Sequence, residues 1–180
     1  MRELSLNILD IAQNSISAGA PLITIEVSEN TTDHTLLIGI YDNGKGMSDD
    51  QVKSVIDPFF TTRTTRKVGM GIPLFKMAAE QTGGSLEIKS ELGVGTEVKA
   101  LFKTNSVDFT PLGDVASTIQ MLITMNTDRD FVYKHSVDGK EFICDTRELK
   151  AILGDVPLDT YEVSQWLIEF IKENTEVLYK

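Results

Sequence analysis

The sequence predicts an α/β fold of the two-layer kind, in which one mixed, mainly antiparallel sheet is covered by helices on a single face. The first observation is a helical period of apolar residues over residues 3–18. The second is strict alternation in residues 22–28 and 35–41, which are separated by the turn-forming stretch 30–33. The third is the order of elements up to residue 103: helix, two strands, two helices, two strands. That order fits a single sheet with one covered face.

The first helix is expected to end at Gly19, because glycine is favoured just after a helix and Pro21 cannot continue one. Its apolar face consists of five residues at helical spacing: Leu4, Ile8, Ile11, Ala12 and Ile16. After the first hairpin, a short helix over residues 48–56 begins with Ser48 as its N-cap and with acidic residues in its first turn. Residues 57–70, rich in threonine and basic side chains, are expected to form a loop.

A third helix over residues 71–81 is expected to end before Gly83, and strands at 85–90 and 96–102 follow it. Apolar periodicity lapses over residues 105–111, so we place a boundary there between a domain of residues 1–104 and a small α/β module of residues 105–180. The elements expected in that module are a helix at 112–125, a hairpin of strands 131–134 and 141–144 around Asp138 and Gly139, and helices at 146–154 and 160–173.

Composition and charge exclude several classes of function. The net charge is −10, and residues 104–180 carry 7 basic and 14 acidic side chains. An acidic surface repels phosphate backbones, so no nucleic acid partner is expected. A single cysteine, Cys144, cannot form an internal disulfide, and with only two histidines the chain argues against a zinc site. No apolar run reaches the ~18 to 20 residues that span a bilayer and no signal peptide is visible, so we expect a cytoplasmic protein without a membrane partner.

The polar side of the first helix has an unusual composition. Asn7, Asp10, Asn14 and Ser17 fall within one stripe about 80° wide, opposite the apolar face. A solvated face more often carries Glu, Lys and Arg, which favour helix by a few tenths of a kcal/mol each. The stripe is therefore either a ligand-binding face or an ordinary solvent-exposed face.

Two glycine-containing segments could approach a ligand closely. Residues 42–47, Asp-Asn-Gly-Lys-Gly-Met, follow an apolar strand, where the Asp42 carboxylate could accept a hydrogen bond from an exocyclic amine. Residues 68–72, Val-Gly-Met-Gly-Ile, open a helix whose free amides attract phosphate. Each segment by itself is also typical of a simple turn.

Taken together and in this order, the segments resemble the GHKL superfamily of ATP-binding domains, which includes sensor histidine kinases, DNA gyrase, Hsp90, MutL and the anti-sigma-factor kinases. Residues 10–20 resemble its N box, 42–47 its G1 box, 57–63 its F box, and 69–72 followed by Lys76 its G2 box. Residues 82–86 and 93–96 match the end of a kinase ATP-binding domain. The resemblance covers residues 1–103 and implies a Bergerat-type fold that binds ATP with Mg2+.

The resemblance also implies roles for individual residues. Asn14 would hold Mg2+ through its amide oxygen, and Asp42 would accept from the adenine amino group with Thr96 beside the base. Gly44, Gly46 and Met47 would shape the adenine wall. Further ATP contacts are expected from Ser17, Phe60, Thr62, Met70 and Ile72.

Residues 61–71 would form a lid in which Gly69 and Gly71 offer amides to the phosphates. Arg63, Arg66 and Lys67 are either phosphate partners or a solvated basic loop. Two positions depart from the kinase pattern. Ser17 stands where many kinase N boxes have Lys or Arg, and Val68 where a Ser or Thr often precedes the G2 glycines. Other residues must then bind the phosphates, and the basic cluster of residues 63–67 is a candidate.

Asp10 lies one turn before Asn14, at the position that resembles the general-base Glu of gyrase, Hsp90, MutL and the anti-sigma kinases. Asp10 is expected either to be catalytic or to stay a polar residue near the metal. Three hypotheses follow: an ATPase or a kinase acting on a separate protein, a regulatory module that binds ATP without turnover, and a degenerate domain that keeps only the fold.

The chain begins inside the N box, so we do not expect the helical hairpin that carries the phosphoacceptor histidine in sensor kinases. His34 and His135 are expected to be ordinary surface residues. Residues 105–180, with apolar positions such as Trp166 and Phe170, are expected either to dock a protein partner or substrate, or to pack against the first domain; a homodimer is left open.

Overall fold

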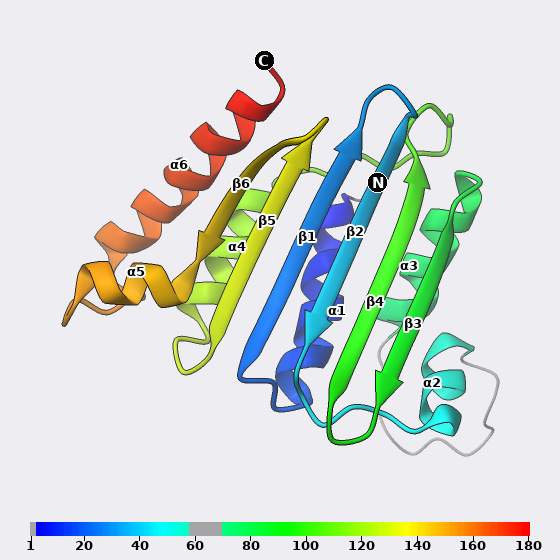
Figure 1. Ribbon diagram of the computed structural model, residues 1–180, viewed down its shortest axis with the longest axis horizontal. Helices are drawn as coiled ribbons and strands as arrows, with labels where there is room; N and C mark the ends of the chain where they lie inside the picture. Colours follow the sequence, from blue (N-terminus) through cyan, green and yellow to red (C-terminus); the bar gives the residue numbers. More distant parts are fainter. Residues whose placement is uncertain (1–2, 58–69) are drawn as a thin grey trace.

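The computed structural model describes residues 3–57 and 70–180 and contains a six-stranded sheet with helices packed on one face (Figure 1). The predicted fold class is confirmed. The elements of the first part are α1 (Leu4–Ser17), β1 (Leu22–Asn30), β2 (Thr35–Asp42), α2 (Asp49–Ile56), α3 (Gly71–Gln81), β3 (Ser85–Glu91) and β4 (Gly95–Lys103). Those of the second part are α4 (Val115–Thr124), β5 (Asp130–Val137), β6 (Lys140–Asp145), α5 (Thr146–Leu153) and α6 (Tyr161–Leu178).

The strand order is β3-β4-β2-β1-β5-β6, so the sheet continues from the first part of the chain into the second. Among the described strands, β1 and β5 pair in parallel and the other neighbours are antiparallel. The parallel pair joins the two parts, with Ile25 opposite Tyr133. Residues 105–180 therefore pack against the first hundred residues, which was one of the two alternatives left open by the sequence.

Helix α1 lies at the centre of the helical layer, between α3 and α4, behind strands β1 and β2 (Figure 1). Its apolar residues Leu4, Ile8 and Ile11 are buried, whereas Asp10 and Asn14 are exposed, as the predicted polar stripe requires. Burial of that face, at about 25 cal/mol per Å² of apolar surface, stabilises the position of α1 on the sheet. The polar stripe is thereby held in a defined orientation.

Two tight turns at one end of the sheet are tied to each other. Asp138, in the turn between β5 and β6, has a positive φ of 50°. Its carboxylate accepts hydrogen bonds from the Thr31 backbone N–H at 2.8 Å and from the Thr31 hydroxyl at 2.5 Å, across the β1–β2 turn. These bonds lower the pKa of Asp138 below its ordinary value. The two hairpins are thus connected at their tips as well as along the β1–β5 ladder.

The prediction that His135 is a surface residue is wrong. His135 lies within β5 and is only 2% exposed, because the C-terminal end of α6 covers it. Its Nδ1 atom pairs with the Tyr133 hydroxyl at 2.8 Å and its Nε2 atom with the Tyr179 hydroxyl at 3.1 Å. His34 is exposed in the β1–β2 turn, in agreement with the prediction. Across residues 3–57 and 70–180, the helices are too short or too polar to cross a bilayer.

Candidate functional site

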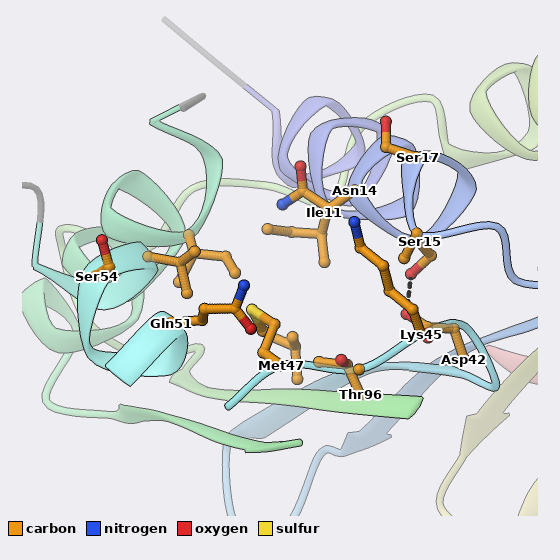
Figure 2. A pocket seen from close by; sticks show the side chains of 15 residues that line it. Ile11, Asn14, Ser15, Ser17, Asp42, Lys45, Met47, Gln51, Ser54 and Thr96 are labelled. Atoms are coloured by element: carbon orange, nitrogen blue, oxygen red, sulfur yellow. Dashed lines mark hydrogen bonds between the residues drawn. The ribbon is translucent and has the colours of Figure 1, made fainter. Parts of the chain in front are cut away.

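A pocket of about 370 Å³ opens between the polar side of α1, the loop after β2, helix α2 and strand β4 (Figure 2). Its polar wall comes from α1, the β2 loop, α2 and β4: Asn14, Ser15, Ser17, Asp42, Lys45, Gln51, Ser54 and Thr96. Its apolar wall is made by Ile11, Ala18, Met47, Val55, Ile72 and Val98. A cleft of this size that combines apolar walls with convergent polar groups is typical of a small-molecule site.

Asp42 is held rigidly at the end of β2. The Ser15 hydroxyl donates to its Oδ2 atom at 2.5 Å, and the Gly44 N–H donates to its Oδ1 atom at 2.9 Å. An ionised carboxylate has about four acceptor positions, so Asp42 can still accept from a ligand. The Asp42 side chain therefore offers an oriented acceptor to the pocket.

The loop after β2 fits tightly against the protein's own backbone. Gly46 has φ 72°, and a Cβ atom there would overlap the Glu91 carbonyl oxygen. A Cβ atom on Gly44 would stand 2.9 Å from the Ala18 Cβ atom. The Lys45 N–H donates to the Ala18 carbonyl at 3.0 Å, and the Lys45 carbonyl accepts from the Gly93 N–H at 2.7 Å. The glycines thus bring the loop close to α1 and to the β3–β4 turn. Gly46 lines the pocket, whereas Gly44 does not line it and instead donates to Asp42.

Thr96 and Met47 are positioned through Ser90. The Ser90 hydroxyl accepts from the Met47 N–H at 2.8 Å and contacts the Thr96 hydroxyl at 2.8 Å. Thr96 also lies directly opposite Asp42 in the β2–β4 ladder. These contacts fix the Thr96 hydroxyl beside the end of β2 that carries Asp42, and they fix the Met47 backbone on the wall of the pocket.

Asn14 and Ser17 both line the pocket from α1, one turn apart. The Asn14 amide forms no hydrogen bond within the described part of the chain, and Figure 2 shows it at the rim of the pocket. The described residues contain no group of three or more His, Cys, Asp or Glu side chains that could hold a metal ion. A divalent cation here would fit Asn14 only together with oxygen atoms from a ligand and water, which suits Mg2+.

Asp10 does not line this pocket. It is exposed on α1, and a Cβ atom on Gly71 would lie 3.3 Å from the Asp10 Cβ atom. Asp10 is therefore beside the N-terminus of α3. Ile72 lines the pocket, Gly71 is buried, and Met70 is the exposed N-cap of α3, with no side-chain cap bond. The predicted contacts Phe60, Thr62, Arg63, Arg66, Lys67 and Gly69 lie outside the described residues.

The sequence reasoning missed Ser15, Lys45, Gln51 and Ser54 as pocket residues. Lys45 stands inside the recognised 42–47 segment, and Figure 2 shows its side chain running along the pocket toward Asn14. Its charge, in a position next to two glycines, was a signal that could have identified it. Ser15 carried no such signal, because its role depends on the approach of α1 to β2.

The sequence of this chain is similar to parts of several bacterial sensor proteins. Sensor histidine kinase ZraS of Salmonella typhi is 37% identical over 73 residues, which are 41% of this chain and 15% of that protein. Sensor protein SrrB of Staphylococcus aureus is 37% identical over 101 residues, which are 53% of this chain and 17% of that protein. The chain thus spans less than a fifth of the length of these sensor proteins.

A solved structure, the Aquifex aeolicus MutL ATPase domain complexed with ADP, shares the fold. It superposes with a TM-score of 0.53 at 15% identity, covering 85% of this chain and 69% of that one. Residues 1–106 match the model of a family described as histidine kinase-, DNA gyrase B- and HSP90-like ATPases. All residues that line the pocket lie in this part of the chain. The chain belongs to this family, the GHKL superfamily of ATP-binding domains.

Proposed function

We propose that the chain binds Mg-ATP in this pocket and transfers the γ-phosphate to water or to a hydroxyl group of a separate protein. The observation that carries the proposal is the Asp42 carboxylate, oriented by Ser15 and Gly44 and open to the pocket. The 6-amino group of adenine is a hydrogen-bond donor, so it complements this acceptor, whereas guanine presents a carbonyl oxygen at the same position. We therefore expect a preference for ATP over GTP.

The wall around Asp42 suits a flat, mostly apolar ring. Met47, Ile72 and Val98 supply apolar surface, and Thr96 supplies a hydroxyl on the same side as the carboxylate. A purine would gain from the burial of its faces on this wall and from the hydrogen bond at its edge.

The phosphate groups would extend toward Asn14 and Lys45. Asn14 would hold Mg2+, whose charge balances that of the phosphate oxygens. Ser17 stands where many kinase N boxes have a basic residue. Lys45 lines the pocket and points toward Asn14 (Figure 2), so it supplies a cation near the proposed phosphate site. The free backbone amides at the start of α3 would add further donors, since α3 has no side-chain cap. Lys45 is thus our candidate for the missing basic residue.

Asp10 is the candidate general base. It lies one helical turn before Asn14 and beside Gly71, so it faces the same end of α3 that would receive the phosphates. A carboxylate there can take a proton from the attacking hydroxyl group.

One observation favours a second function, in which ATP binding regulates a partner without turnover. Asp10 does not line the described pocket, so no described carboxylate other than Asp42 reaches it. In this case ATP would stabilise the conformation that binds it better, and thereby change the affinity for a partner protein.

A phosphate-release assay on the purified protein, run alongside calorimetric ATP binding, separates the two functions. If Asp10 is the base, the Asp10→Asn variant loses at least about 100-fold in turnover and keeps its ATP affinity. The Asp33→Asn variant, in the exposed β1–β2 turn, should retain both. Measurable ATP binding without phosphate release, and without phosphate transfer to a partner found by mass spectrometry, would favour the regulatory function. Normal turnover by the Asp10 variant would exclude Asp10 as the base.

A further inference from the structure

A second hollow lies at the opposite edge of the sheet from α2 and α3, where α5 and α6 flank strand β6 (Figure 1). Its volume is about 500 Å³, and its walls are largely apolar. We call it the α5–α6 groove. It shares no residue with the nucleotide pocket, so whatever it binds is separate from the proposed ATP chemistry.

Both flanking helices present apolar residues to the groove at helical spacing. Helix α5 contributes Leu149 and Ile152, and α6 contributes Val163, Trp166 and Phe170. Rows of side chains three and four residues apart form ridges with a furrow between them, and a third helix can place its own ridge in such a furrow. The groove therefore has the form of a helix-binding site.

The groove is open to solvent, unlike a small-molecule cavity. Ile152 is 80% exposed, Ile143 on β6 is 46% exposed, and Trp166 is 43% exposed. Small-molecule sites usually bury most of the ligand's surface, whereas these three side chains lie exposed along the groove. Contiguous exposure of large apolar side chains is instead typical of a protein–protein contact.

The aromatic side chains of the groove already pack against one another before any partner binds. The Trp166 and Phe170 rings stack with centroids 4.6 Å apart and 14° between their planes. The Phe170 and Phe142 rings pack edge to face, with their centroids 5.3 Å apart. A supported, half-exposed tryptophan of this kind is a common anchor in protein interfaces, because it offers a large area at a small cost in side-chain entropy.

The charge around the groove favours a partner of opposite charge. Residues 145–178 contain eight acidic and three basic side chains. Glu148 and Glu162 line the groove, and neither forms an ion pair within the described residues. Two of the basic side chains are already engaged, since Arg147 pairs with Asp145 and Lys150 with Asp130. A basic partner segment would gain from Glu148 and Glu162, and an acidic one would be repelled.

We propose that the α5–α6 groove docks an amphipathic helix of a partner protein, with an apolar face bordered by lysine or arginine residues. The apolar face fills the furrow between Ile152 and Trp166, and the basic residues meet Glu148 and Glu162.

The single tryptophan of the chain makes the test direct, because fluorescence from Trp166 reports on the groove itself. The probes are two helical peptides of about 18 residues with the same leucine face, one flanked by lysines and the other by glutamates. We expect the lysine peptide to change Trp166 emission in a saturable way, and to bind at least tenfold more tightly than the glutamate peptide. A proline placed in the middle of the lysine peptide should abolish the effect, since it breaks the helix.

Three variants of the full chain sharpen the test. Ile152→Asp should weaken binding of the lysine peptide at least tenfold without unfolding the protein, because Ile152 is exposed. Val107→Asp, at a fully exposed position outside the groove, is the matched control and should bind normally. The double variant Glu148→Lys and Glu162→Lys should reverse the preference toward the glutamate peptide. Circular dichroism checks that each variant is folded.

The proposal is overturned if both peptides bind equally, if neither changes Trp166 emission, or if Ile152→Asp has no effect. It is also overturned if Trp166 emission changes with protein concentration alone and sedimentation shows dimers, because the groove is then covered by a second copy. Loss of ATP binding in Asp42→Ala with retained peptide binding would show that the two sites are independent.

Discussion

The Ser15 hydroxyl on α1 donates a hydrogen bond of 2.5 Å to the Asp42 carboxylate at the end of β2. Ser15 is buried, so this bond joins the helical layer to the sheet directly beneath the pocket. It fixes the direction in which Asp42 presents its remaining acceptor positions. The proposed adenine acceptor is therefore positioned by a contact between α1 and β2.

Removal of the Ser15 hydroxyl should weaken nucleotide binding without removing the pocket. Charge-assisted hydrogen bonds contribute about 1.5–3 kcal/mol, so Ser15→Ala should lower ATP affinity by about ten- to a hundredfold, measured by calorimetry. Asp42→Ala, which removes the acceptor itself, should abolish measurable binding. Ser164→Ala, on α6 and outside the pocket, is the control. Equal effects of the two serine variants would contradict the role of Ser15.

Lys45 should act on the phosphates and not on the base. We expect Lys45→Met to weaken ATP binding about tenfold and to leave adenosine binding nearly unchanged, since only ATP carries the charge that Lys45 meets. The effect should shrink as salt is raised. Lys89→Met, on exposed strand β3, serves as the charge-matched control. An equal loss of ATP and adenosine affinity would show that Lys45 shapes the pocket instead.

Gly46 should tolerate no side chain. In Gly46→Ala the new Cβ atom meets the Glu91 carbonyl oxygen and the backbone is left-handed, so we expect a loss of roughly 3 kcal/mol or more in the free energy of unfolding. Gly19 has nearly the same φ, 74°, but nothing within 4 Å of its Cβ position. Gly19→Ala should therefore cost only the strain of the left-handed backbone, about 1 kcal/mol. Urea denaturation compares the two, and similar losses would argue against the clash.

His135 should make the fold sensitive to acid. Burial lowers its pKa from 6.5 to about 4, and the groups that face it are the hydroxyls of Tyr133 and Tyr179, the latter also bonded to Glu29. Between these two pH values the unfolded chain takes up a proton that the folded chain does not. The free energy of unfolding should thus fall as the pH drops from about 7 to 4, by on the order of 3 kcal/mol.

Denaturation curves measured across this pH range test the assignment. His135→Gln should flatten the dependence, because glutamine does not titrate. His34→Asn should leave it unchanged, since His34 is exposed and asparagine accepts its positive φ. A slope that survives in the His135 variant would assign the effect to other groups.

The division at residue 104 can be tested by truncation. A fragment of residues 1–104 would lack β5, which pairs with one edge of β1, and α4, which packs against α1. The edge of β1 would then be unpaired. We expect the fragment to unfold at lower urea concentration than the full chain or to self-associate through β1, as exposed edges do. A fragment as stable as the full chain would establish residues 1–104 as an independent domain.

Much of the secondary structure could be predicted because its signals are local. The apolar period of α1, the alternation in β1 and β2, and the capping serine of α2 each act within a few residues of chain. The motif at residues 42–47 and the polar stripe of α1 likewise identified the family and about a third of the pocket residues, among them Asn14 and Asp42. These properties are consequences of backbone geometry and of short-range hydrogen bonds.

The contacts between distant segments required the folded structure. The burial of His135 beneath Tyr179, the parallel pairing of β1 with β5 and the bond from Ser15 to Asp42 join residues 27 or more positions apart. The local sequence around a histidine in a strand does not indicate whether a later helix will cover it. The local sequence around a serine on a helix likewise does not indicate which carboxylate it will contact. The amino-acid sequence by itself thus determined the elements and the family of this protein. Tertiary packing alone decided which polar groups meet, because their partners are brought together only when the sheet and its helical layer assemble.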